Sequence, residues 1–250
     1  MEYMRTFLHA CLLLMIALAP WSVRAAPLRV SASSGWGMPI GEVDAQGHLS
    51  GGIMHELYGA LGREMNVPVV VLTLPRKRID NAVMHGEVDL RCFLNRRWVG
   101  NPADYRWSGT LFTVQDVVVA RADTPSPANL AELRGKTLGT VLGYVYPDAL
   151  QVQLGKQIVR EDAPTPALAL SKLLLGRSDY ALVDSLVLAW YAKHQRVRFA
   201  ANPLVVNSYE IECATPIRTG QPGQAALAAL ERMRKRGDIA QILARYQSAH

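Results

Sequence analysis

Short apolar runs alternate with helical patterns along the first part of the chain. Four runs rich in apolar and β-branched residues predict strands, at residues 28–32, 67–74, 88–94 and 114–119. Ile53, Leu57 and Leu61 recur at helical spacing on one face. They predict an amphipathic helix over 51–65, and a second helix fits 79–85. The order strand, helix, strand, helix, strand favours a mostly parallel sheet with helices packed on its faces.

The same alternation restarts after a linker at residues 123–129 that contains Pro and Ser. A clean break followed by a new series of strands and helices indicates a second α/β unit. We expect its strands at residues 137–142, 157–160 and 179–183, and its helices at 147–154 and 167–175.

The end of the chain resembles the closing part of the first unit. A strand at 208–213 is followed by a helical stretch over 224–246, which the Gly237-Asp238 pair should break or bend. We therefore infer two lobes between which the chain crosses twice, near 116–121 and near 207–213. Two crossings form a hinge, and a hinge suits closure around a ligand.

The first 25 residues are typical of a cleavable secretory signal. Arg5 lies in a short n-region, an apolar stretch covers 11–18, and residues 23–25 offer a cleavage site. The apolar stretch is shorter than the roughly 20 residues of a membrane-spanning helix. A lipid anchor is disfavoured because Cys11 precedes this stretch instead of following it. We expect a mature protein that diffuses freely in the periplasm.

Charge and motifs exclude several classes of function. The formal net charge is +6, and the basic residues are scattered except at 76–78, 96–97 and 232–236. These clusters lack the interleaved aromatic residues typical of nucleic-acid binding. The chain has no GxSxG, HExxH or phosphate-binding loop, and its histidines are dispersed. We therefore expect no nucleic-acid partner, no metal, no cofactor and no enzymatic activity.

Two cysteines, Cys92 and Cys213, follow the signal segment. An oxidising compartment allows them to form a disulfide, and two separate buried thiols are the alternative. The chain has no CxxC spacing that would indicate a metal site.

Five motifs follow one another in a recognisable order. They are Gly47-His48-Leu49-Ser50-Gly51-Gly52-Ile53, Arg78 followed by Gly86-Glu87-Val88-Asp89, Trp107-Ser108, Leu130-Ala131-Glu132-Leu133-Arg134-Gly135-Lys136, and Gly176-Arg177-Ser178-Asp179-Tyr180-Ala181-Leu182-Val183-Asp184. Together they resemble the extracellular solute-binding proteins of family 3, which serve polar amino-acid ABC transporters.

This resemblance implies a type II periplasmic-binding fold of the α/β class. Each of its two lobes is a mostly parallel sheet flanked by helices, and two crossover strands join them. Lobe I would comprise residues 26–118 and 212–250, and lobe II residues 119–211. The implied topology sets the strands of Cys92 and Cys213 side by side in lobe I, which favours the disulfide.

The resemblance also implies positions that bind the ligand. Trp36 would cover the ligand with its ring, or else pack within its own lobe. Asp184 would receive the ammonium group of the ligand at a strand end, or else cap the following helix. After a glycine turn, free N–H groups would hold a carboxylate. Tyr144, Val145 and Tyr146 in this turn would line the pocket, or the tyrosines would pack between the lobes.

The arginine that grips the ligand carboxylate in the family is missing, because its position here is Asn101. A guanidinium forks onto a carboxylate in a way that no amide can reproduce. The candidates to replace it are Arg78, Arg96 and Arg97, each of which is alternatively a surface arginine, with Asn95 and Trp98 as weaker members of the set. With Arg76 they favour an electropositive cleft for a ligand with at least one carboxylate.

The resemblance therefore implies a monomeric periplasmic protein that captures a small, polar, amino-acid-like solute bearing a carboxylate. A membrane permease of an ABC transporter would receive the solute. Two alternatives stay open, a ligand-binding protein for a separate sensory receptor and a dehydratase of the cyclohexadienyl type on the same fold.

Overall fold

A computed structural model describes residues 26–218 and 221–247. The signal peptide predicted at residues 1–25 lies outside this range. Within the described ranges, no helix is both long enough and apolar enough to cross a membrane.

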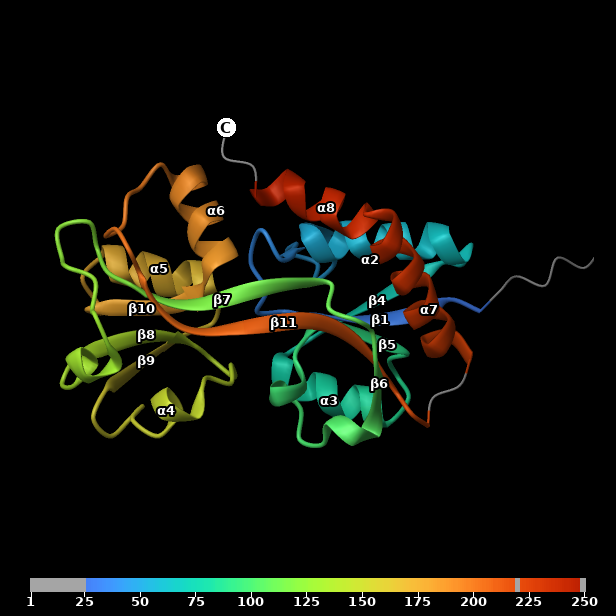
Figure 1. Cartoon of the computed structure of the whole chain (residues 1–250), viewed down its shortest axis with the longest axis horizontal. Coiled ribbons are helices and arrows are strands. Elements are labelled where there is room, and N and C mark those ends of the chain that lie inside the picture. Colours follow the sequence, from blue (N-terminus) through green and yellow to red (C-terminus); the bar gives the residue numbers. More distant parts are fainter. Residues whose placement is uncertain (1–25, 219–220, 248–250) are drawn as a thin grey trace, which may run out of the picture.

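In the described residues, nine strands form one continuous mixed sheet with helices on both sides, and two short strands pair in a separate sheet (Figure 1). The first half of the structure contains β1 (Leu28–Ser33), β2 (Glu42–Val43), β3 (Leu49–Gly51), α2 (Ile53–Met65), β4 (Val69–Leu74), α3 (Arg76–Met84), β5 (Leu90–Leu94), β6 (Tyr105–Trp107), α7 (Gln221–Arg236) and α8 (Asp238–Gln247). The second half contains β8 (Thr137–Val141), α4 (Asp148–Gln151), β9 (Val159–Ala163), α5 (Pro166–Leu174), β10 (Tyr180–Asp184) and α6 (Ser185–Gln195).

Two long strands, β7 (Phe112–Val119) and β11 (Leu204–Pro216), run through both halves. The strand order is β4-β1-β5-β11-β7-β10-β8-β9, with β6 paired to β11. β1 is parallel to β4 and β5, and β8 is parallel to β9 and β10. β7 and β11 are antiparallel to each other. The expected α/β fold, with parallel strands flanked by helices and two connecting strands, is confirmed.

Each of the eight predicted strands overlaps a strand of the structure. The helix expected over 51–65 is α2, which begins after Gly52. Gly52 has a φ of 92°, and a Cβ there would lie 2.8 Å from the Cα of Gly41. Only glycine accepts this entry into the helix. The break expected at Gly237 is also confirmed, because α7 ends at Arg236 and α8 begins at Asp238.

Two helical features were not expected from the sequence. α3 begins at Arg76, three residues earlier than predicted, and α6 was implied only by the alternative role of Asp184 as a helix cap, without a pattern that predicted its residues. α6 carries apolar residues on all sides, including Leu186, Leu188 and Trp190, so it lacks the one-sided stripe that marks an amphipathic helix. It packs against β7, β10, α5 and α8.

The last helix, α8, connects the two halves. Its Tyr246 hydroxyl donates to Glu56 Oε1 of α2 at 2.6 Å, and Arg245 forms an ion pair with the same carboxylate. The ring of Tyr246 also contacts Trp190 of α6, with ring centroids 5.6 Å apart. α8 therefore contacts both α2 of the first half and α6 of the second half.

A disulfide fixes the position of β11 in the first half. Cys92 of β5 and Cys213 of β11 are bonded, and these strands are neighbours in the sheet. Both cysteines are buried. The bond closes a segment with a sequence separation of 121 residues, which includes the entire second half.

Candidate functional site

A pocket lies where the two halves meet. Its lining residues come from the start of α3, the end of β5 and the short 3-10 helix Arg96–Trp98 that follows it, the strand β7, the turn after β8 and the end of β10. They are Arg76, Phe93, Trp98, Val114, Asp116, Tyr144, Val145 and Asp184. Their side chains leave a free volume of only about 20 Å³, room for a single water molecule. A solute could therefore enter only if the two halves moved apart.

Two carboxyl groups are neighbours in the lining of this pocket. Asp184 of β10 is directly opposite Asp116 of β7 in the antiparallel register. Burial and then the charge of Asp184 raise the pKa of Asp116 to about 7, against a lowering effect of the Tyr209 hydroxyl. Burial also raises the pKa of Asp184 to about 6, although backbone N–H groups partly oppose this rise. Near neutral pH the pair therefore retains part of its protons.

Asp184 also has a structural task. Its Oδ1 accepts a hydrogen bond from the backbone N–H of Val187 at 2.9 Å and caps α6. The capping role is thus visible in the structure. Because the same side chain lines the pocket, a cap and a ligand-binding role are compatible.

Arg76 provides the positive charge of the pocket. Its guanidinium carbon lies 5.4 Å from the ring centroid of Trp98 and 5.2 Å from that of Tyr144, so the cation sits between two aromatic faces. Its side chain makes no hydrogen bond or ion pair with any residue in the described part of the chain. Burial lowers the pKa of Arg76. Tyr144 belongs to the second half, so this contact also spans the two halves.

Four candidates from the sequence line the pocket, namely Trp98, Tyr144, Val145 and Asp184, and Arg76, expected to make the cleft electropositive, lines it as well. Arg78 does not, because it is exposed on α3 two positions after Arg76. Trp36 is 7% exposed and packs in the core of the first half, 6.1 Å from Phe93 between ring centroids.

Tyr146 and Asn101 have structural roles in the fold. Tyr146 is buried in the core of the second half, and its hydroxyl accepts a hydrogen bond from the N–H of Val141 at 2.7 Å. The side chain of Asn101 caps the short 3-10 helix Pro102–Asp104 by accepting from the N–H of Ala103. The position that carries an arginine in the family thus carries an amide with a capping role here.

Asn95, Arg96 and Arg97 line a different pocket of about 450 Å³, on the side of β7 and β11 where Thr113, Ser208 and Glu210 are exposed. Arg96 forms an ion pair with Glu212 at 3.0 Å and stacks over Trp107. Asn95 accepts from the N–H of Arg97 and caps the 3-10 helix Arg96–Trp98. The structure therefore separates these residues from Asp184.

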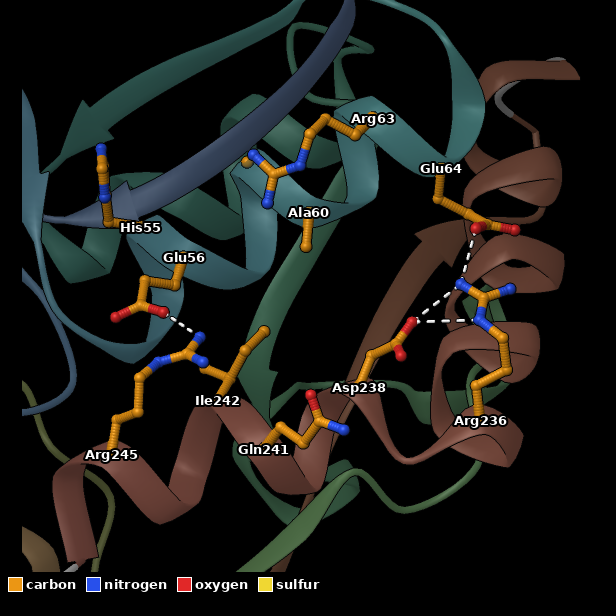
Figure 2. A pocket seen from close by; sticks show the side chains of 11 residues that line it. His55, Glu56, Ala60, Arg63, Glu64, Arg236, Asp238, Gln241, Ile242 and Arg245 are labelled. Carbon is orange, nitrogen blue, oxygen red and sulfur yellow. Dashed lines mark hydrogen bonds and ion pairs between the residues drawn. The ribbon is translucent and has the colours of Figure 1, made fainter.

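A larger groove of about 540 Å³ lies on the outside of the first half, between α2 and the α7–α8 pair. Ion pairs close its two ends, as Figure 2 shows. Arg236 bridges Glu64 and Asp238 at 2.6 and 2.7 Å, and Arg245 binds Glu56. These charged side chains pair with one another. We therefore interpret the groove as the solvated edge of the contact between α2 and the α7–α8 pair.

Sequence reasoning missed Asp116 as a pocket residue. Asp116 interrupts the apolar run that ends in Val117, Val118 and Val119, and a lone carboxylate in such a run is the available signal. Phe93 was not anticipated either, and its apolar strand offered no distinguishing signal.

Comparisons with solved structures agree on the fold, whereas two other comparisons found no match. No protein-family model matches the chain. No curated protein matches it either. Among solved structures, the arginine-, lysine-, histidine-binding protein ArtJ from Geobacillus stearothermophilus has a TM-score of 0.72 and 18% identity, over 90% of this chain and 96% of that chain.

Two further solved structures share this fold. A histidine kinase sensor domain similar to periplasmic binding proteins has a TM-score of 0.71 and 22% identity, over 90% of this chain and 97% of that chain. The ancestral amino-acid-binding protein AncCDT-1, a precursor of cyclohexadienyl dehydratase, has a TM-score of 0.71 and 19% identity, over 89% of this chain and 95% of that chain. The chain thus has the fold of the amino-acid-binding periplasmic proteins.

Proposed function

We propose that the protein is an exported solute-binding protein of the polar amino-acid family. Its two lobes would close on a small, amino-acid-like solute with a carboxylate and deliver it to the permease of an ABC transporter. Residues 26–118 and 212–250 form lobe I in this proposal, and residues 119–211 form lobe II. β7 and β11 are the hinge, and the signal at residues 1–25 directs the chain to the periplasm.

Arg76 is the residue on which this proposal depends. A guanidinium between two aromatic rings, without a carboxylate partner among the described residues, is balanced well by a carboxylate on a solute. Asp184 lines the same pocket and would receive an amine of the solute. A molecule that carries both groups therefore matches the chemistry of the pocket.

A thermal-shift screen of amino acids, short peptides and organic acids tests the proposal. A ligand at about 100 times its Kd adds roughly 2.7 kcal/mol to the stability of the folded state. This corresponds to a rise in melting temperature of roughly 5–11 °C, since 1 kcal/mol shifts the melting temperature of a chain of this size by about 2–4 °C. If no compound of these three classes raises the melting temperature, the proposal is wrong.

Asp184→Asn separates the two roles of Asp184 in this screen. An asparagine keeps a side-chain oxygen that can cap α6 but removes the charge that attracts an amine. Solutes with an amine should lose much more affinity than organic acids without one. Equal losses for both classes would mean that Asp184 acts only as a cap.

The sensory alternative uses the same solute chemistry and differs only in the partner. Affinity capture from solubilised membranes, with and without the solute found in the screen, distinguishes the two. Recovery of a permease supports transport, and recovery of a receptor with a signalling domain supports sensing.

One observation favours the dehydratase alternative, because a carboxyl with a pKa of about 7, such as Asp116, can donate a proton to a leaving hydroxyl. The charges of the pocket argue against it, since one guanidinium faces two carboxyl groups. A substrate such as prephenate, which has two carboxylates, would meet repulsion there. Incubation with prephenate and arogenate decides the point, and absence of turnover removes the alternative.

A further inference from the structure

Three polar side chains form a row across the strands that join the two halves. Asp184 of β10 is opposite Asp116 of β7, and Asp116 is opposite Asn207 of β11. Directly opposed residues of antiparallel strands point to the same face, with Cβ atoms about 4.5–5.5 Å apart. The carboxyl groups of Asp116 and Asp184 are therefore neighbours, and both line the pocket.

Asp116 has no structural partner comparable to that of Asp184. Asp184 caps a helix, whereas Asp116 interacts with the hydroxyl of Tyr209, a diagonal neighbour on β11. No ion pair within the described residues includes Asp116. A largely desolvated carboxylate without a cationic partner is costly, and like charges opposite each other destabilise a sheet. Stability alone therefore does not account for an acid at this position.

Other polar groups of the same pocket also lack partners in the described chain. The indole N–H of Trp98 is buried beside the Tyr209 side chain, near enough to act on its hydroxyl, but it makes no hydrogen bond of normal geometry with a described residue. The Arg76 guanidinium lies over two aromatic faces and makes no ion pair with a described residue. Buried donors and charges are nearly always satisfied in folded proteins. Unpaired groups of both signs in one pocket indicate a polar solute as their partner.

We propose that Asp116 is a second solute-binding carboxylate and makes the site selective for solutes that carry a cationic group in addition to the amine and carboxylate. This inference rests on the proposed function. Arg76 balances the carboxylate of the solute and Asp184 balances its amine. Asp116 is then left for one further cation. With a solute that has a single amine, Asp116 keeps its proton and stays neutral.

This selectivity depends on pH. The titratable groups that face Asp116 are Asp184 from β10, Tyr209 from β11, Arg76 from α3, and Tyr144 and Tyr146 from the turn after β8. Because burial and the charge of Asp184 raise the pKa of Asp116, an additional cation must displace a proton below about pH 7. Binding of such a solute therefore releases protons, and its affinity falls as the pH decreases.

Calorimetry with two matched pairs of probes tests the inference. L-arginine and L-citrulline differ in the charge of the side-chain end, and so do L-lysine and L-norleucine. Near pH 8, the cationic member of a pair should bind at least roughly tenfold more tightly than its uncharged counterpart. Asp116→Asn should remove this ratio but leave the binding of the uncharged member. Gln115→Ala is the matched control, because Gln115 is exposed on the same strand and lines no part of the pocket.

Proton release gives a second, independent measurement. Near pH 6.5, titrations of the cationic probe in two buffers with different heats of ionisation should show clearly more proton release by the natural protein than by Asp116→Asn, in which only Asp184 can still release a proton. If Asp116→Asn does not fold, Asp116→Ser serves in its place. Equal affinities within both pairs, or a ratio that persists in the variant, overturn the role of Asp116 even if the thermal-shift screen finds a solute. A screen that finds no solute overturns the proposed function itself.

Discussion

Asp116 opposes folding when it is ionised, because its carboxyl is buried beside a second carboxyl. Its pKa is about 7 in the folded chain, against an ordinary value near 3.9. The folded state thus holds the proton of Asp116 more tightly than the unfolded state does. The stability that Asp116 contributes is therefore fully present below about pH 4 and is lost as the pH rises through 7. Asp116→Asn should raise the free energy of unfolding by roughly 1–3 kcal/mol near pH 8 and hardly at all near pH 4.

Urea denaturation of both proteins at the two pH values measures this difference. Comparison at the same pH removes the contributions of the other carboxylates, such as Glu64, whose ion pairs with Arg236 and Arg232 lower its pKa to about 2. An equal effect of the substitution at both pH values would contradict a raised pKa for Asp116.

Arg76 and Arg78 provide a matched pair of arginines on one helix. Arg76 lies in the pocket between two rings, whereas Arg78 is exposed. Arg76→Gln should weaken binding of a solute with a carboxylate by roughly 10- to 100-fold, because a charge-assisted hydrogen bond to a desolvated carboxylate is lost. Arg78→Gln should leave the affinity unchanged. Titration calorimetry with the solute from the screen measures both affinities. Equal losses of affinity in the two variants would mean that the carboxylate of the solute does not bind Arg76.

At the scale of elements, the strands and α2 were predictable because their patterns are local. Alternating apolar runs and the spacing of Ile53, Leu57 and Leu61 determine them directly. α6 was not predictable in this way, because a helix that is apolar on all sides lacks a one-sided stripe. The resemblance to a known family pointed to Tyr144, Val145 and Asp184, because Asp184 ends one of its motifs and the other two follow its glycine turn.

The choice between Arg76 and Arg78 depended on where α3 begins. Side chains two residues apart in a helix point about 200° apart. A helix that starts at Arg76 therefore places Arg76 in the pocket and turns Arg78 towards solvent. Helix boundaries are the least certain part of a sequence pattern. Asp116 depended on register, because only the pairing of β7 with β10 brings it beside Asp184.

α8 allows a test of how one helix holds both halves. Tyr246→Phe removes the hydrogen bond to Glu56 but keeps the ring contact with Trp190. We expect it to lower the free energy of unfolding by about 1 kcal/mol. Tyr246→Ala also removes the ring and should cost roughly 2–4 kcal/mol. Gln241→Ala, an exposed change on the same helix, should have almost no effect. Equal losses for the two Tyr246 variants would show that the contact with α6 contributes nothing.

For the molecule as a whole, the position of the disulfide determines where the hinge can bend. The bond holds β11 against β5 at Cys213, within the first half. Residues 204–211 of β11 pair with β7, and the register shifts between Val205 and Asn207. The free volume of about 20 Å³ requires the halves to separate before a solute enters. We infer that bending is confined to the part of β7 and β11 between the disulfide and the second half.

The disulfide should therefore stabilise the fold without controlling solute binding. It closes a segment of 121 residues, and in the chain-entropy model a loop of about 100 residues is worth roughly 4.7 kcal/mol. Replacing both Cys92 and Cys213 by alanine should lower the free energy of unfolding by about 2–5 kcal/mol and leave the affinity for solute within about twofold. Denaturation and calorimetry on the same preparation measure both quantities. The natural protein treated with a reductant is the matched control, and it should lose a similar amount of stability. A large loss of affinity in the alanine variant would show that the bond also sets the geometry of the pocket, which β5 and β7 line on either side of β11.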